Sequence, residues 1–160
     1  HGRRTEKLIP HGPRRRDTAQ LPNADVRLVE PEPTLPFLDK SFDVIFSVSL
    51  WTHLRPELAE PYLYEVRRML KDDGVALITT AGYAAMEPWK NLIAWDKSIT
   101  PQDLRERGTI FYPSPGGMIG NAAHSPEYIQ ANWTRIFSRI ETIEAVIGTH
   151  KVQDLNIMRK

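Results

Sequence analysis

Residues 41–50 constrain the fold of this chain more than any other segment. Their sequence, SFDVIFSVSL, is apolar on both faces through its middle. A strand of this kind is typical of a parallel sheet that is covered by helices on both faces. We therefore expect residues 41–50 to form a buried strand in a layered α/β protein.

The segment that follows has the periodicity of a helix. Five apolar residues between positions 58 and 70 fall on one helical face. Pro61 is unfavourable inside this segment, because proline has no N–H and its ring clashes with the preceding turn. We expect a loose turn over residues 56–60, a regular helix that begins at Pro61, and a second buried strand over residues 75–81.

The second half of the chain is predicted to add two helices and a hairpin. Residues 100–108 begin with a Thr-Pro pair and end in glycine, as a short capped helix does. Residues 125–137 begin with Ser-Pro-Glu and carry a helical apolar face. Residues 140–147 and 152–158 are two strands whose short connection favours an antiparallel hairpin.

The first twenty residues differ from the rest of the chain. Six of them are arginine or lysine, and they show neither helical nor strand periodicity. No aromatic residue lies among them to stack on bases, and the net charge of the chain is only +1. We expect a basic, poorly ordered arm over residues 1–20, a single domain over residues 21–160, and no nucleic-acid partner.

The composition excludes several other classes. The chain has no cysteine, which excludes disulfides, thiolate metal sites and a cysteine nucleophile. No apolar run approaches the roughly 18 residues of a membrane span, and the basic start lacks the apolar stretch of a secretory signal. The five histidines have no spacing that indicates a metal site. We therefore expect a cytoplasmic protein without a metal ion.

Residues 35–45, LPFLDKSFDVI, resemble the L-P-F-x-D-x-S-F-D-x-[IV] signature of class I S-adenosylmethionine (SAM)-dependent methyltransferases. The similarity continues through residues 47–54, which match the family's fourth strand and the loop after it. Residues 65–71 and 74–80 are similar to the helix ending E-x-x-R-x-L-K and to the fifth strand. The resemblance implies SAM as the cofactor. It also implies a partial Rossmann-like sheet of parallel strands, with a C-terminal antiparallel hairpin and flanking helices.

One part of the family pattern is not visible. In the family, the first strand ends in a glycine-rich D-x-G-x-G loop and the second ends in an acid that binds the ribose; neither occurs before Leu21. The glycines within residues 116–120 follow no strand and are expected to form a mobile loop near the substrate. We therefore expect a truncated, C-terminal part of a methyltransferase domain that binds SAM poorly when isolated.

Ligands of open α/β sheets bind beyond the carboxyl ends of the strands. This rule places three residues at the cofactor: Ser49, Leu50 and Trp51. His53 follows them and is the candidate general base, because the ordinary pKa of histidine lies near neutrality; the competing interpretation is a structural role at the helix entry. By resemblance, Glu32 lies near the adenine amine, and Glu30 is its close rival.

The tail of the chain resembles the last helix and hairpin of small-molecule methyltransferases. Tyr112 and His124 flank the glycine-containing loop and are candidate substrate-binding residues, although ordinary packing also explains both. The resemblance implies methyl transfer to a small-molecule, sugar- or lipid-linked acceptor. The alternative is a non-catalytic, methyltransferase-like module that serves as an interaction partner.

The neighbour of the strand over residues 41–50 is a separate question. In the family the first strand lies beside it, and without that strand an unpaired edge would invite wrong pairing. We expect residues 26–29 to pair with this edge, because the residues in between are enough for a crossover. The alternative is a bare edge through which the chain dimerises or aggregates.

Overall fold

The structure is a computed structural model that describes residues 27, 29, 32–92, 96–113, 120–147 and 152–160. The basic arm and most of the glycine-containing loop lie outside these described residues. In chain order the elements are β1 (Phe42–Ser47), α2 (Pro56–Met69), β2 (Leu70–Ala81), α3 (Tyr83–Leu92), α4 (Pro101–Arg107), β3 (Thr109–Pro113), β4 (Gly120–His124), α5 (Pro126–Trp133), β5 (Arg139–Ile147) and β6 (Gln153–Arg159).

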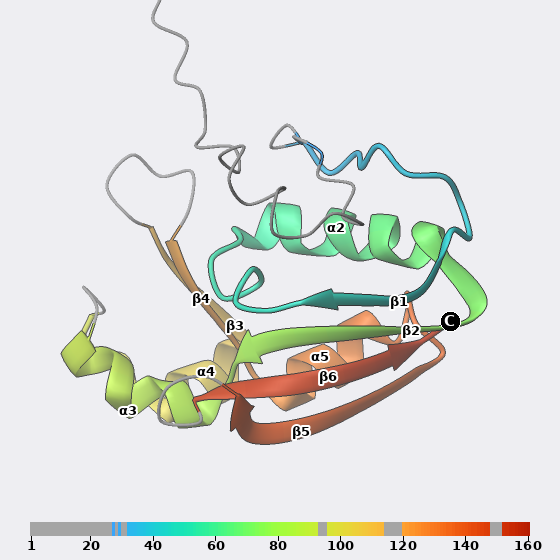
Figure 1. The fold of residues 1–160 in the computed structure, drawn as a ribbon. Helices are drawn as coiled ribbons and strands as arrows, with labels where there is room; N and C mark the ends of the chain where they lie inside the picture. The colour runs from blue at the N-terminus through green and yellow to red at the C-terminus, as the bar shows by residue number, and fades with distance from the viewer. Residues whose placement is uncertain (1–26, 28, 30–31, 93–95, 114–119, 148–151) are drawn as a thin grey trace, which may run out of the picture.

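The long strand β2 organises the sheet (Figure 1). One edge of β2 pairs in parallel with β1 and, at Ala81, with β4. The other edge pairs antiparallel with β6, which forms an antiparallel hairpin with β5. β3 extends the sheet beside β4. The predicted α/β class, with parallel strands, flanking helices and a C-terminal hairpin, is confirmed.

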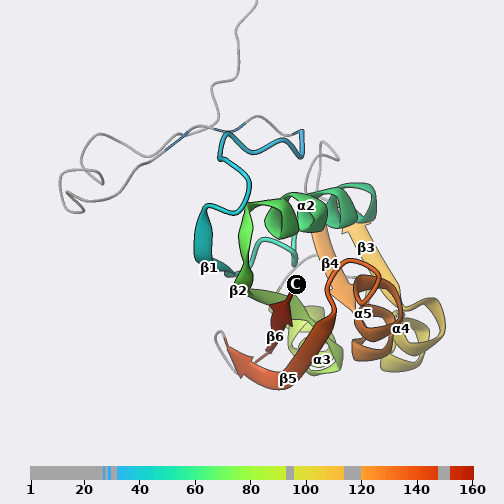
Figure 2. The ribbon, with the colours of Figure 1, turned by 90° about the vertical axis from the view of Figure 1, so that its right-hand side faces the viewer.

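Helices α2 and α5 pack on one face of the sheet. Ile45, Ala76 and Met158 lie in register on β1, β2 and β6, and they pack in one core with the apolar sides of α2 and α5. Figure 2 shows both helices on the same side of these strands. Burial of these apolar side chains is the main stabilising contribution of the core.

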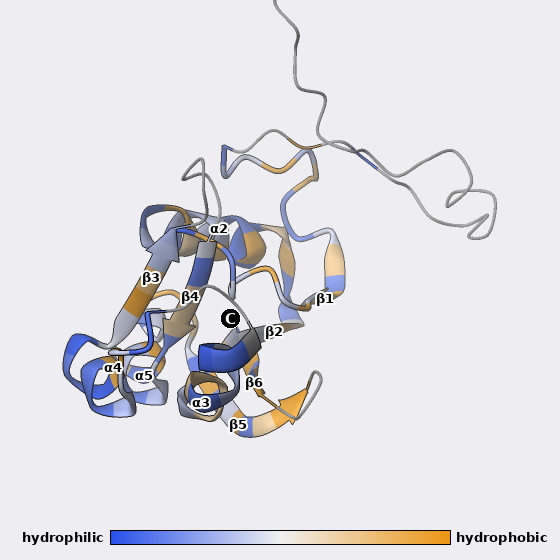
Figure 3. Ribbon diagram, turned by 90° about the vertical axis from the view of Figure 1, so that its left-hand side faces the viewer, coloured by the Kyte–Doolittle hydropathy of each residue, from blue (hydrophilic) through white to orange (hydrophobic). Residues whose placement is uncertain are grey.

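On the opposite face, Ala81 and Ala123 pack with α3 and α4 in a second core cluster, whereas the part formed by β1 and β5 is uncovered among the described residues. Val44 and Phe46 on β1 are 54% and 75% exposed, and Ile143 on β5 is 39% exposed. Figure 3 shows apolar residues on β1 and toward the hairpin end of β5. The prediction that residues 41–50 are buried between two layers of helices is therefore wrong. Apolar residues on both faces of a strand do not reveal whether a second layer is present.

Helix α2 begins earlier than predicted. It runs continuously from Pro56, and Pro61 lies inside it. The N–H groups of Leu58 and Ala59 both donate to the carbonyl of Arg55, which closes the first turn. Pro61 removes one N–H near the start of the helix, whereas the helical path buries Ala59 and Leu63 against the sheet. Tertiary packing therefore outweighs the local preference of the proline.

The predicted pairing of residues 26–29 with β1 is not found in the described part of the chain. There, β1 pairs with β2, and Arg27 and Val29 belong to no strand. Val26 and Leu28 lie outside the described residues. The Arg27 guanidinium lies 4.8 Å from the centroid of the Phe37 ring and donates to the carbonyl of Pro36. Cation–π attraction holds Arg27 on the loop before β1 instead of in a strand.

The predicted helix signals in the second half are confirmed. Thr100 forms a capping box with Asp103 at the start of α4, and Gly108 ends this helix with φ of 76°. Ser125 caps α5 by accepting a hydrogen bond from the N–H of Tyr128. No helix within the described ranges is long and apolar enough to span a membrane.

Candidate active site

A tight turn follows β1 at the carboxyl end of the parallel strands. Ser49 in this turn has φ of 60°, in the left-handed region that non-glycine residues rarely adopt. Its N–H donates to Thr79 Oγ1 on β2 at 2.8 Å, and its carbonyl accepts from Thr52 Oγ1 at 2.8 Å. Its hydroxyl pairs with the side chain of Gln153 on β6. The turn is therefore hydrogen-bonded to two strands of the sheet.

The end of the same turn lies along β4. The N–H of Ala122 donates to the carbonyl of Thr52 at 2.8 Å, and the N–H of Gly120 donates to the carbonyl of His53 at 3.2 Å. His53 Nδ1 lies 2.7 Å from the carbonyl oxygen of Gly120. A carbonyl only accepts hydrogen bonds, so Nδ1 must carry the proton. In the neutral ring, Nε2 then keeps its lone pair, and the His53 side chain is exposed.

An apolar pocket of about 290 Å³ lies between the turn, β1 and α2. Its lining includes Val29, Leu35, Phe46, Leu50, Trp51 and Tyr62. Leu50 is 43% exposed and stands at the surface of this pocket. Trp51 is only 1% exposed, and its Nε1–H donates to the carbonyl of Ala59 at 3.3 Å. Trp51 is therefore a fixed wall of the pocket and part of the core.

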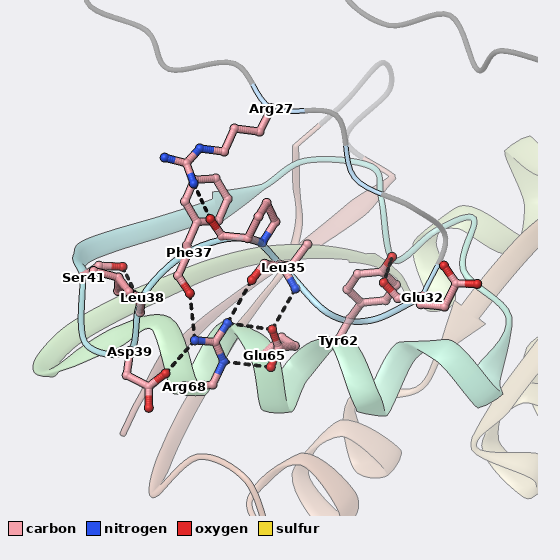
Figure 4. Close-up of polar contacts among 11 residues, drawn as sticks. Arg27, Glu32, Leu35, Phe37, Leu38, Asp39, Ser41, Tyr62, Glu65 and Arg68 are labelled. Atoms are coloured by element: carbon pink, nitrogen blue, oxygen red, sulfur yellow. Dashed lines mark hydrogen bonds and ion pairs between the residues drawn. The ribbon is translucent and has the colours of Figure 1, made fainter.

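The loop over residues 35–39 is fixed to α2 by Arg68 and Glu65 (Figure 4). The Arg68 guanidinium donates to the carbonyls of Leu35 at 3.1 Å and Phe37 at 2.8 Å. It also pairs with Asp39 at 2.6 Å and with Glu65 at 2.8 Å. Glu65 in turn accepts from the N–H of Leu35 at 2.9 Å. These contacts hold Leu35 at the pocket wall.

The charges in this cluster stabilise each other. The hydrogen bonds from Arg68 hold the pKa of Glu65 below its ordinary value, although burial acts in the opposite direction. The bonds to Glu65 and Asp39 raise the pKa of Arg68. Both groups therefore remain charged near neutral pH.

Glu32 lies beside the pocket at Tyr62. The Tyr62 hydroxyl is 3.5 Å from the Glu32 carbonyl, and Figure 4 shows the two residues side by side. Burial raises the pKa of Tyr62, and the negative charge of Glu32 adds to this increase. The Glu32 residue is exposed, so its carboxylate is accessible to a ligand. Its rival, Glu30, lies outside the described residues.

The two candidate substrate-binding residues lie elsewhere. His124 is 1% exposed and packs between the rings of Tyr128 and Trp133, at centroid distances of 5.9 and 5.7 Å. Burial lowers its pKa to about 4, so it is neutral at pH 7. Tyr112 lies on β3 and packs against the second core cluster. The structure thus brings together four of the predicted site residues: Ser49, Leu50, Trp51 and His53. Substrate binding by Tyr112 and His124 stays a prediction.

Three residues that position this site were not among the sequence-based candidates: Thr79, Gln153 and Arg68. Arg68 belongs to the E-x-x-R pattern that carried the resemblance, so its position was visible but its role was not. Gln153 is 104 residues from Ser49 in sequence, and no local pattern indicates their contact. Among the described residues, no group of three or more histidine, aspartate or glutamate side chains is arranged to hold a metal ion.

Comparisons with known proteins agree with the fold. Residues 10–78 match the family model described as a methyltransferase domain. A protein of Pyrococcus horikoshii OT3 shares the fold with a TM-score of 0.57 at 18% identity, over 90% of this chain and 64% of that one. The chain thus spans less than two thirds of that protein.

Two further solved structures are more distant. A SAM-dependent methyltransferase of Methanosarcina mazei matches with a TM-score of 0.47 at 18% identity, over 83% of this chain and 66% of that one. A SAM-dependent methyltransferase of Aquifex aeolicus matches with a TM-score of 0.45 at 17% identity, over 89% of this chain and 59% of that one. The family-model match includes the signature around β1, so residues 10–78 of this chain are similar to a methyltransferase domain.

Proposed function

We propose that the turn after β1 and its apolar pocket bind the adenine end of SAM, and that His53 is the general base for methyl transfer. The acceptor is a small molecule or a sugar- or lipid-linked group. The observation that carries this proposal is the apolar pocket directly at the carboxyl end of β1, where open α/β sheets bind their ligands.

The residues present fit the adenine part of the cofactor. Leu35, Leu50 and Tyr62 offer apolar surface to a flat ring, and the exposed carboxylate of Glu32 lies near Tyr62, where it can accept an N–H from an exocyclic amine. A volume of about 290 Å³ is at the lower end of ligand pockets and suits one ring system better than the whole cofactor. The described pocket is therefore one subsite of a larger site.

When bound, SAM supplies a methyl group activated by its sulfonium. The protein must then hold the acceptor in line with that methyl group, which is mainly a matter of alignment. A methyl acceptor with an O–H or N–H group loses its proton as its oxygen or nitrogen bonds to the methyl carbon. The lone pair of His53 Nε2 takes up this proton. The carbonyl of Gly120 accepts the Nδ1–H and stabilises the imidazolium that results.

A titration of the ¹⁵N-labelled protein with S-adenosylhomocysteine up to millimolar concentration tests this proposal. We expect chemical-shift changes at Leu50, Trp51 and Tyr62 that increase with ligand concentration as a Kd near 1 mM, about −4 kcal/mol, predicts. Leu50→Glu should abolish these changes, because it places a charge in the apolar pocket. Leu38→Glu is the matched control, because Leu38 is 81% exposed and does not line this pocket. Shift changes that avoid the pocket, or that persist in Leu50→Glu, contradict the proposal.

A second candidate function, a non-catalytic interaction module, is favoured by the uncovered part of the sheet. Val44 and Phe46 on β1 are 54% and 75% exposed, and Val48, directly after the strand, is 58% exposed. Contiguous exposed apolar surface is typical of interaction sites. The same titration separates the two functions, because the module requires no response to S-adenosylhomocysteine.

A further inference from the structure

Gln153 reaches across the sheet to the turn after β1. It lies at the start of β6, in register with Ala81 at the carboxyl end of β2. Its Nε2 donates to Ser49 Oγ at 2.7 Å, and the Ser49 hydroxyl lies 3.1 Å from its Oε1. The side-chain amide of Gln153 and the hydroxyl of Ser49 thus form a reciprocal pair.

The partner of Gln153 has an unfavourable backbone conformation. Left-handed φ is rare for residues other than glycine, and it persists only where surrounding contacts enforce it. The N–H of Ser49 is held by Thr79 and its carbonyl by Thr52. The side chain of Ser49 is held by Gln153, which comes from a different strand. Together these contacts fix all three polar groups of Ser49.

The conformation of Ser49 decides where the next residues point. Leu50 and Trp51 follow it directly and line the apolar pocket. The carbonyl of Leu50 also accepts from the N–H of His53 at 2.9 Å, so His53 moves with the same turn. A change at Ser49 therefore alters the pocket and the base together.

We propose that Gln153 is a positioning residue that holds Ser49 in its left-handed conformation and thereby sets the shape of the cofactor pocket. The cofactor part of this inference rests on the proposed function. A primary amide suits the role because it both donates to and accepts from one hydroxyl. A carboxylate in its place would only accept, and an aliphatic side chain would do neither.

The test compares Gln153→Ala and Gln153→Glu with Gln130→Ala, a matched control at an exposed position on α5. The first readout is amide hydrogen exchange of Ser49, measured by NMR without any ligand. The second is the affinity for S-adenosylhomocysteine, measured by shift changes at Leu50 and Trp51. The first readout does not depend on cofactor binding, so the two proposals are tested separately.

In Gln153→Ala we expect the Ser49 amide to exchange about tenfold faster and the ligand affinity to fall about five- to tenfold, as the loss of one or two hydrogen bonds predicts. Gln153→Glu keeps one bond and should lie between Gln153→Ala and the parent. Equal Ser49 exchange in Gln153→Ala and Gln130→Ala overturns the positioning role. Faster exchange with unchanged affinity overturns its link to the pocket. A parent protein that shows no shift changes overturns the proposed function, while the exchange readout still decides the role of Gln153.

Discussion

Asp154 is a buried carboxyl group that should make folding stability depend on pH. It lies on β6 opposite Thr80 and is 0% exposed. Its Oδ1 accepts from the N–H of Ala145 at 2.9 Å, whereas its Oδ2 has no hydrogen-bond partner among the described residues. Gly82 makes room for it, since a Cβ at this glycine would lie 2.0 Å from Oδ2.

Burial raises the pKa of Asp154 from 3.8 to about 6, and the charge of Glu144 adds to the increase. Below about pH 3 the carboxyl is protonated in both the folded and the unfolded state and has no effect on stability. Between about pH 4 and 6 only the unfolded state ionises, so the folded state loses stability as the pH rises. Above about pH 6 the loss is complete and amounts to about 3 kcal/mol.

Asp154→Asn removes this ionisation while its side-chain oxygen can still accept from Ala145. The new amide donor has a cost of its own, but that cost is the same at every pH. We therefore expect the free energy of unfolding of Asp154→Asn, relative to that of the parent, to be about 2 kcal/mol higher at pH 7 than at pH 4.

Urea unfolding at pH 4.0 and 7.0 measures this difference. Asp73→Asn is the control, because Asp73 is an exposed aspartate on β2. A difference between Asp154→Asn and the parent that is the same at both pH values would refute the argument that burial raises the pKa of this carboxyl.

Three other predictions follow from the site. Calorimetry of the isolated chain should show only weak SAM binding, with a Kd near the millimolar range, because the pocket contacts one end of the cofactor; saturation at micromolar concentrations would contradict this. In an active methyltransferase that carries this segment, His53→Ala should lower turnover about 10²-fold with nearly unchanged SAM affinity; turnover within a few-fold of the parent means that His53 is structural. Arg68→Ala should lower the free energy of unfolding by about 2 kcal/mol in urea denaturation, because it releases two loop carbonyls. Arg67→Ala, an exposed neighbour, is the control, and an equal effect of both variants would contradict the role of Arg68.

The elements with strong local signals could be predicted from the sequence. Thr100 and Ser125 mark helix starts through their own hydrogen bonds, so a short segment contains all the information needed. The terminal hairpin was predicted within one residue at each strand end, because its alternating pattern and short connection are also local. The signature around β1 located the candidate site for the same reason.

Features that depend on distant residues were not predictable in this way. The continuous path of α2 through Pro61 is decided by what Ala59 and Leu63 bury, and this is a tertiary property. The burial of His124 depends on rings contributed by α5, so the residues around His124 in the sequence do not reveal that its side chain lies in the core. The sequence did not predict the strands β3 and β4, because each has only five residues and pairs mainly with the other, so neither has a strong local pattern.

The central position of β2 has a consequence for how the chain is made. β2 lies in the middle of the sequence, but its second edge is completed by residues 153–159. The Lys160 ammonium also donates to the carbonyl of Leu70, at the very start of β2, at 2.6 Å. During synthesis, β2 therefore leaves the ribosome long before its antiparallel partner exists. Such late, non-local pairing slows folding and leaves a strand edge open to other nascent chains. Chaperones that shield extended apolar segments are expected to contact residues 70–81 in that interval.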